Sequence, residues 1–162
     1  MSIKQYFHKA VIGRNELVNF PTLGLEKIPA KIDSGAYRSA VHATKIVEKD
    51  GELSFVILLG HAQTPETGIE VKTKKYQKVW VANSFGRREE RYEVKLRTKL
   101  GSKVFNASFS LANRSRNLFP VLIGREILNG RFMIDTNYSP IKRKTLALPK
   151  GADVMFDIEE KE

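Results

Sequence analysis

Apolar and polar residues alternate over several short segments of this chain, which is the pattern of β-strands that bury one face. Turn residues, mostly glycine, follow many of these segments. The expected strands cover residues 29–33, 53–59, 79–82, 91–97, 104–111 and 120–123. Short strands separated by turn signals predict an all-β fold, either a barrel or a sandwich.

Some segments depart from this pattern. Residues 125–129 precede a glycine and predict one short helix, and residues 39–44 predict a helical turn. Residues 62–73 contain a proline and a glycine and are expected to form a surface loop. Residues 79–82 and 91–97 flank a glycine-containing segment, so they predict a β-hairpin. Helix is therefore expected to be a minor part of the fold.

The composition suits one folded domain and excludes several kinds of chemistry. The 162 residues are 41% hydrophobic, which is enough for a core. The longest unbroken apolar run, residues 55–59, is far shorter than a membrane helix, and the first residues lack the apolar segment of a secretory signal. Without cysteine, the chain has no disulfide, thiolate metal site or cysteine nucleophile. We expect a cytoplasmic protein that does not bind membranes.

Charge divides the chain into a basic body and an acidic end. Lys and Arg outnumber Asp and Glu by 28 to 18, and residues 72–103 carry eleven basic side chains against three acidic ones. We expect an N-terminal extension over residues 1–10, a domain over residues 11–150 and an acidic tail over residues 151–162. A basic body attracts an acidic partner, although a basic face that serves solubility is the simpler alternative.

A carboxylate stands at the end of the first expected strand. Residues 30–36 read Ala-Lys-Ile-Asp-Ser-Gly-Ala. Gly35 permits a tight turn that exposes the Asp33 carboxylate, and the Ser34 hydroxyl can donate a hydrogen bond within the turn or to a symmetry mate. Because Asp-Ser-Gly is also ordinary turn chemistry, this motif alone does not establish a site.

Other familiar catalytic motifs are absent from the sequence. Its three histidines, His8, His42 and His61, do not form a His-Glu-x-x-His helix, and no glycine-rich phosphate loop is present. We therefore expect no cofactor and no metal. A zinc site built from scattered histidines and carboxylates remains a weaker alternative.

Several ordered blocks around the Asp33 turn resemble one protein family. The blocks are residues 24–43, 83–91, 109–125 and 130–135. The third block ends in Leu-Ile-Gly-Arg, which closes an apolar strand just before the expected helix. In this order the blocks resemble the bacterial retropepsin-like aspartic peptidases often labelled "ATP-dependent zinc protease". The resemblance spans residues 11–135.

The resemblance implies a closed, retropepsin-like β-barrel with one short helix and an aspartic peptidase site at Asp33. Aspartic proteolysis needs two carboxylates close together, and this chain offers one usable motif. We therefore expect a homodimer in which each copy supplies Asp33. Some family members occur with an enzyme that adds glutamates to a ribosomal protein. That context and the basic body imply an acidic polypeptide substrate, such as a glutamate-modified or ribosomal protein.

The expected site extends beyond the carboxylate. The expected roles are turn geometry for Ser34, Gly35 and Ala36, cleft or flap positions for Arg38, His42, Ser84, Gly86 and Arg91, and structural support for Gly124 and Arg125. In this hypothesis Arg91 binds a carboxylate of the substrate. The simpler alternatives are an exposed strand charge for Arg91 and a core or surface position for His42.

The sequence departs from the family pattern at a few positions. Ser34 replaces the usual threonine, and Asn113 stands where aspartate is typical. Asp135-Thr-Asn resembles the Asp33 motif but lacks its glycine, so we interpret Asp135 as a structural residue at a strand end. Residues 11–17 echo residues 122–128, but seven residues are too few to establish a duplication.

Two other functions stay open from the sequence. A non-catalytic binding module could hold ribosome or RNA on its basic face, with Phe85 and Tyr92 stacking on bases, although no RNA-binding motif supports nucleic acid. A hydrolase that uses a metal at Asp33 is the third hypothesis. Loss of activity with Asp33→Asn would favour the peptidase. Salt-sensitive RNA binding would favour the binding module, and sensitivity to a chelator would favour the metal hydrolase.

Overall fold

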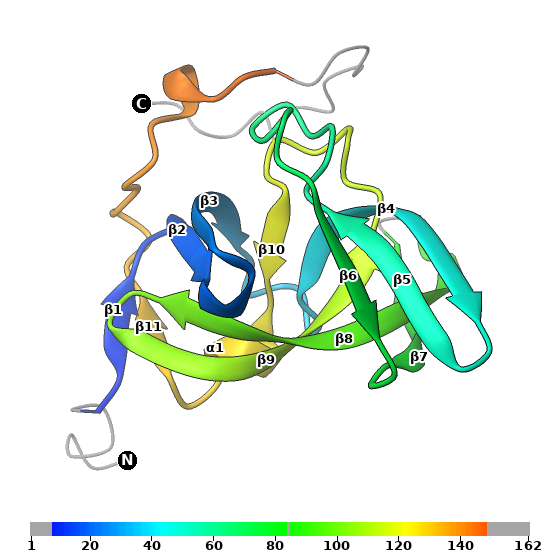
Figure 1. The fold of residues 1–162 in the computed structure, drawn as a ribbon. Coiled ribbons are helices and arrows are strands. Elements are labelled where there is room, and N and C mark those ends of the chain that lie inside the picture. Colours follow the sequence, from blue (N-terminus) through cyan, green and yellow to red (C-terminus); the bar gives the residue numbers. More distant parts are fainter. Residues whose placement is uncertain (1–7, 84, 149–162) are drawn as a thin grey trace.

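Six strands form a closed ring in the computed structural model, which describes residues 8–83 and 85–148. Around the ring the order is β10 (Val121–Ile123), β3 (Leu25–Ile32), β2 (Asn15–Phe20), β8 (Arg88–Leu100), β9 (Lys103–Ala112) and β4 (Ala40–Lys49). The ring closes because β4 also pairs with β10 (Figure 1). The predicted all-β, barrel-like fold is confirmed.

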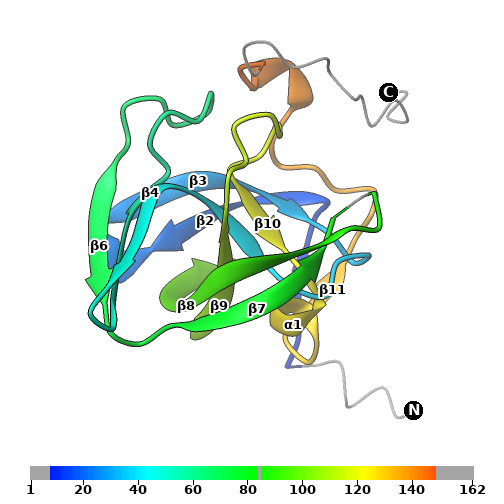
Figure 2. The same ribbon diagram turned by 90° about the vertical axis from the view of Figure 1, so that its right-hand side faces the viewer.

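The remaining strands and the helical elements lie outside this ring. Strands β5 (Glu52–Ile57) and β6 (Ile69–Thr73) extend the sheet from β4, and β7 (Gln77–Ala82) pairs with β8 (Figure 2). A separate parallel pair joins β1 (Ala10–Ile12) to β11 (Phe132–Ile134). The helical elements are α1 (Arg125–Leu128) and the 3-10 turns η2 (Pro21–Leu23) and η3 (Arg143–Thr145). Within the described residues, no helix is long and apolar enough to cross a membrane.

The alternation in the sequence becomes an inside and an outside of the ring. Along β8, Leu96 and Leu100 are buried while Lys95 and Lys99 are exposed. On the inside, aromatic rings of β2 and β9 meet edge to face, with 5.5 Å between the ring centres of Phe20 and Phe109.

Two secondary-structure predictions were wrong in part. Residues 39–44 do not form a helical turn, because residues 40–44 belong to β4. Ala40, Val41, His42 and Ala43 are all buried, since β4 lies between neighbours, and a strand buried on both faces shows no alternation. The expected loop over residues 62–73 ends early, because residues 69–73 form β6 on the edge of β5.

Gly124 is the tightest backbone contact next to α1. A β-carbon at this position would lie 2.7, 2.8 and 2.9 Å from the carbonyl oxygens of Arg38, Tyr37 and Ala36. Its φ of −100° is ordinary, so glycine is required here for space and not for backbone conformation. Backbone oxygens cannot rotate away as the end of a flexible side chain can.

We expect Gly124→Ala to destabilise the protein by about 3 kcal/mol, because residues 36–38 must shift to admit one methyl group. Gly130→Ala is the matched control, since Gly130 has open space around its Cα but a positive φ of +76°. Its expected cost is about 1 kcal/mol. Urea unfolding of both variants measures the difference, and equal losses would contradict the packing argument.

Candidate active site

Asp33 lies directly after β3, where β3 and its parallel neighbour β10 both end. Its backbone N–H donates to the carbonyl of Ile123 (2.9 Å), which extends the β3–β10 ladder by one bond. The N–H of Gly35 donates to Asp33 Oδ1 (2.9 Å), and the N–H of Ala36 donates to the Asp33 carbonyl (3.3 Å). The turn therefore fixes the carboxylate while leaving it half-buried.

The first residues of α1 hold this turn through hydrogen bonds. The N–H groups of Arg125 and Glu126 donate to the carbonyls of Ala36 (2.8 Å) and Tyr37 (2.9 Å). These are helix-terminal donors that have no partner within the helix, so the turn caps the helix and the helix holds the turn. Arg125 Nη1 also donates to the Ser34 carbonyl (3.0 Å). The structure thus places Gly124 and Arg125 against the Asp33 turn.

Ser39 connects the same turn to β9, a link that the sequence did not indicate. Its Oγ accepts a hydrogen bond from the N–H of Gly124 (2.9 Å). Its carbonyl accepts from both the N–H (3.0 Å) and the hydroxyl (3.1 Å) of Ser110. Ser39 and Ser110 are buried, so each polar group that folding removes from water has a partner here.

Arg38 reaches away from the turn to the base of the β7–β8 hairpin. Its Nη1 lies 2.7 Å from Glu93 Oε2, and Gln77 Nε2 donates to the other Glu93 oxygen (2.6 Å). Glu93 is 3% exposed, and Gln77 and Glu93 are cross-strand partners. Arg38 therefore ties the Asp33 turn to the hairpin. Sequence analysis missed Gln77 and Glu93. Glu93 could not be identified because its partner, Arg38, is 55 positions away in the chain.

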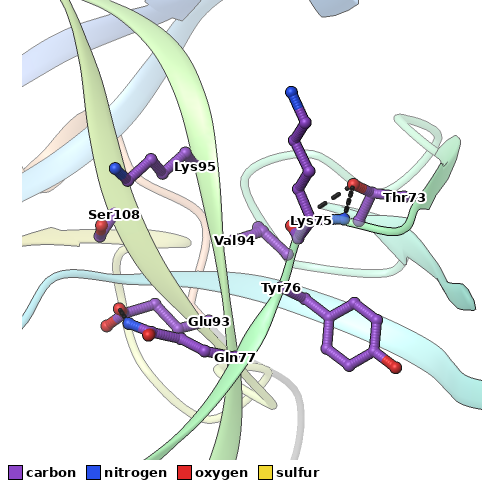
Figure 3. Close-up of a pocket in the computed structure, with 8 residues that line it drawn as sticks. All are labelled: Thr73, Lys75, Tyr76, Gln77, Glu93, Val94, Lys95 and Ser108. Atoms are coloured by element: carbon purple, nitrogen blue, oxygen red, sulfur yellow. Dashed lines mark hydrogen bonds between the residues drawn. The ribbon is translucent and has the colours of Figure 1, made fainter. Parts of the chain in front are cut away.

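A cavity of about 510 Å³ opens beside this contact, between the β6–β7 connection and strands β8 and β9 (Figure 3). Figure 3 shows Gln77 and Glu93 side by side at one end of it. Its lining residues are Thr73, Lys75, Tyr76, Gln77, Glu93, Val94, Lys95 and Ser108. Asp33 is not among them, so this cavity and the carboxylate are separate features.

The predicted hairpin is present, with β7 and β8 joined through a tip at residues 83–87. The Asn83 side chain accepts hydrogen bonds from the N–H groups of Phe85 and Arg87 (both 3.0 Å), and Gly86 has a left-handed φ of +73°. Ser84 lies outside the described residues. Glycine suits the φ of this tip, which explains Gly86 without a role in binding.

Arg91 lies on the face of the hairpin that carries Val79 and Glu93. It is the cross-strand partner of Val79, which is buried, and strand alternation places residues 89, 91 and 93 on one face of β8. Its guanidinium forms an ion pair with Glu89. Arg91 is half-buried, so it is not simply an exposed strand charge.

His42 does not line an open cleft, which corrects that expectation in favour of the core position. It is 1% exposed, and its Nδ1 accepts a hydrogen bond from the N–H of Arg114 (2.9 Å). Its Nε2 donates to the Leu59 carbonyl (3.0 Å). His61 is bound in the same way, with Nδ1 accepting from Gln63 (3.1 Å) and Nε2 donating to Asn117 (2.9 Å). Both rings are therefore neutral and structural.

Burial sets the charge state of these two rings, whose centres are 5.4 Å apart. Burial lowers the pKa of His42, and the nearby Arg114 lowers it further, against the opposing effect of the Leu59 carbonyl. Burial, followed by repulsion from the positive charge that His42 gains when it is protonated, lowers the pKa of His61 to about 4.

Arg114 is a buried cation that sequence analysis did not single out. It is 9% exposed, and its Nε donates to the Phe119 carbonyl (3.0 Å). Burial lowers its pKa to about 10; the charge of Arg91 lowers it further, and the charge of Asp33 raises it. Arg114 therefore lies within electrostatic reach of both groups. The sequence signal that could have identified Arg114 was its position within residues 109–125, one of the blocks that resemble the family.

The short echo in the sequence corresponds to a repeated local structure. The N–H of Asp135 donates to the Ile12 carbonyl (2.9 Å), as that of Asp33 does to Ile123. The N–H of Asn137 donates to Asp135 Oδ1 (2.9 Å), the counterpart of the bond from Gly35 to Asp33. Arg14 donates to the Tyr138 carbonyl (2.9 Å) as Arg125 does to that of Ala36. The chain thus contains two Asp turns, each packed on an Ile-Gly-Arg segment.

No group of three or more His, Asp or Glu side chains that could hold a metal ion gathers within residues 8–83 and 85–148. The ligands that a zinc site would need are instead committed elsewhere. His42 and His61 are bonded to backbone groups, and Glu93 is paired with Arg38.

The closed ring and the supported Asp turn define a retropepsin-like protein, the class of single-lobe aspartic peptidases. The family described as "Retropepsin-like aspartic endopeptidase RimB" matches residues 11–145, and the chain belongs to this RimB-like family. This confirms the resemblance inferred from the sequence blocks.

Relatives and a solved structure agree with this placement. The chain is 34% identical over 139 residues to a probable alpha-L-glutamate ligase of Desulfotalea psychrophila, and 30% identical over 135 residues to one of Shewanella pealeana. Each match covers 82% of this chain but only 29% and 30% of the respective relatives, so the chain spans less than a third of their length. A crystal structure of a Legionella pneumophila protein of unknown function is similar, with a TM-score of 0.63 and 29% identity over 80% of this chain and 95% of that one.

The histidine pair makes stability depend on pH. Above pH 6.5 the folded and unfolded chains are both neutral at His61, but between pH 6.5 and about 4 only the unfolded chain takes up the proton. We therefore expect His61 to remove about 2–3 kcal/mol of stability between pH 7 and pH 4.5. Urea unfolding of wild type and His61→Gln at both pH values measures the free energy of unfolding, which should fall more between pH 7 and pH 4.5 in wild type than in the variant. An equal fall in both proteins would contradict the low pKa of His61.

Proposed function

We propose that the protein is an aspartic endopeptidase whose active form is a homodimer, with one Asp33 from each copy at the two-fold axis. The observation that carries the proposal is the Asp33 turn itself: a carboxylate held by the Gly35 N–H at the end of parallel strands and supported by α1. Family membership over residues 11–145 supports the same chemistry.

The surroundings of Asp33 favour a partner carboxylate from a second copy. Ser34 and Gly35 are exposed beside it, and the Ser34 hydroxyl makes no hydrogen bond to another described residue. The second Asp turn of the chain, at Asp135, belongs to the separate β1–β11 pair and lacks the glycine. A two-fold axis through an exposed turn brings identical residues together, which makes the dimer the direct route to a pair.

The pair would act on water and the scissile amide as a unit. Two carboxylates within hydrogen-bonding range cannot both be ionised, so they share one proton. The ionised member removes a proton from water, which attacks the carbonyl carbon, while the protonated member donates to the carbonyl oxygen. The tetrahedral intermediate then breaks its C–N bond as the nitrogen takes up a proton. The products are a carboxylic acid and an amine.

The expected substrate is an acidic polypeptide. The net charge of +10 raises the local concentration of negatively charged chains near the surface. The matched relatives are named probable alpha-L-glutamate ligases, so in them a sequence similar to this chain is part of a longer protein named for glutamate chemistry. We therefore propose a glutamate-rich or glutamate-modified protein, such as a ribosomal protein, as the substrate.

Substitution of the carboxylate tests the chemistry. We expect Asp33→Asn to lower the hydrolysis of a glutamate-rich peptide about a thousandfold or more while leaving the fold intact. Asp135→Asn is the matched control, because that carboxylate has the same turn geometry and asparagine keeps the acceptor for Asn137. It should retain activity. Full activity of Asp33→Asn, or RNA binding indifferent to it, would favour the binding module.

Mixing experiments test the dimer. Equal amounts of wild type and Asp33→Asn, unfolded together and refolded, should give about a quarter of the activity of the same total of wild type, because heterodimers hold one carboxylate. Independent chains would give about half. Light scattering at the assay concentration supplies the second readout, and a strict monomer with half activity would overturn the dimeric mechanism.

A further inference from the structure

Hydrogen-bond acceptors gather at one end of the cavity between the β6–β7 connection and strands β8 and β9 (Figure 3). Glu93 is 3% exposed, so folding has removed this carboxylate from water. Gln77 Nε2 donates to Glu93 Oε1 (2.6 Å), and the Gln77 amide oxygen accepts no hydrogen bond within residues 8–83 and 85–148. This end of the cavity therefore suits a ligand group that donates hydrogen bonds.

The charge at this end is negative, because one guanidinium serves two carboxylates. Arg38 Nη1 lies 2.7 Å from Glu93 Oε2 and 4.0 Å from Glu126 Oε2. The Glu126 Oε2 atom is buried and has no hydrogen-bond partner, since 4.0 Å is too long for one. One positive and two negative groups sum to −1. A cation that enters the cavity beside Glu93 would compensate for this excess of negative charge.

The other side of the cavity is positively charged. In Figure 3 the side chains of Lys75 and Lys95 lie away from Gln77 and Glu93. Neither ammonium group lies within 4.0 Å of a carboxylate in the part of the chain that the structure describes. Ser108 is the cross-strand partner of Lys95 and also lines the cavity. This side therefore suits negatively charged groups of a ligand.

The separation of the two sides matches a small molecule. Glu93 and Lys95 are two positions apart on one face of β8, which corresponds to about 7 Å along a strand. The cavity volume of about 510 Å³ lies within the range of small-molecule sites, about 300–1,000 Å³. The Lys75 backbone N–H donates to Thr73 Oγ1 (3.0 Å), which holds the β6–β7 connection at the cavity.

We propose that this cavity is a binding site for a free acidic amino acid, glutamate or aspartate. Such a molecule carries one ammonium group, for Glu93 and Gln77, and two carboxylates, for Lys75 and Lys95. Charge-assisted hydrogen bonds of this kind are the stronger ones in proteins. The proposal goes beyond the proposed function and does not depend on it, because Asp33 does not line the cavity.

Calorimetric titration of the full chain at low ionic strength tests the proposal with three ligands. L-Glutamate has all three charged groups, glutarate lacks the ammonium group, and L-glutamine lacks the side-chain carboxylate. Because each missing group removes a charge-assisted hydrogen bond, we expect glutarate and glutamine each to bind about tenfold more weakly than glutamate. Equal affinities for glutamate and glutarate would overturn the proposal, since nothing would then recognise the ammonium group.

Substitution of the exposed lysines locates the site. Lys75→Gln and Lys95→Gln should each weaken glutamate binding about fivefold or more. In the variant that has lost the partner of the side-chain carboxylate, glutamate and glutamine should bind within about twofold of each other. Lys99→Gln is the matched control, because it removes an equally exposed lysine from β8 that does not line the cavity. Its affinity for glutamate should stay within about twofold of wild type.

The Asp33→Asn variant separates this site from the active site. It should bind glutamate as wild type does, because the cavity and the carboxylate are separate. Glutamate binding that is lost in Asp33→Asn, or weakened equally by Lys99→Gln and Lys95→Gln, would overturn the cavity as the site while leaving the peptidase possible. Glutamate binding that depends on Lys75 and Lys95 supports the cavity site even if no peptide is hydrolysed. No binding of glutamate or aspartate at millimolar concentration overturns it.

Discussion

The packing of the Asp33 turn on the first residues of α1 is the constraint on which the rest of the site depends. Gly124 lies against three successive backbone carbonyls, and the next two N–H groups bind two of them. Helix donors and turn acceptors thereby satisfy each other, and no side chain could fit between them. The carboxylate itself accepts from the backbone N–H of Gly35, and the side chains of Arg125 and Ser39 hold the turn and the helix start together.

Side chains next to the turn also connect it to distant parts of the barrel. Arg38 joins it to Glu93 on the hairpin, and Ser39 joins it to Ser110 on β9. Closure of the ring through β4 and β10 brings these segments together. A movement of the hairpin therefore has a direct physical route to the turn. The same hairpin carries the ion pair between Arg91 and Glu89.

The two Asp turns show how one local structure serves different purposes. Both have an N–H bond to an isoleucine carbonyl and an aspartate oxygen that accepts from the residue two positions later. The turn at Asp33 has glycine two positions later and follows a strand of the ring; the turn at Asp135 has asparagine there and follows the two-stranded pair outside the ring. The hydrogen-bond geometry is common to both turns, and the sheet that each follows and the residue two positions after the aspartate distinguish them.

The sequence by itself determined most strands, the hairpin, the short helix and the Asp33 turn, because alternation, glycine and strand-end polar residues act over a few positions. It could not determine that residues 40–43 form a strand buried on both faces, since that depends on which neighbours pair with β4. Nor could it identify Glu93, whose partner Arg38 lies 55 positions away, or Arg114, whose backbone N–H binds His42 72 positions away. Only closure of the ring gives a charged side chain its burial and its neighbours, and those decide what it can bind.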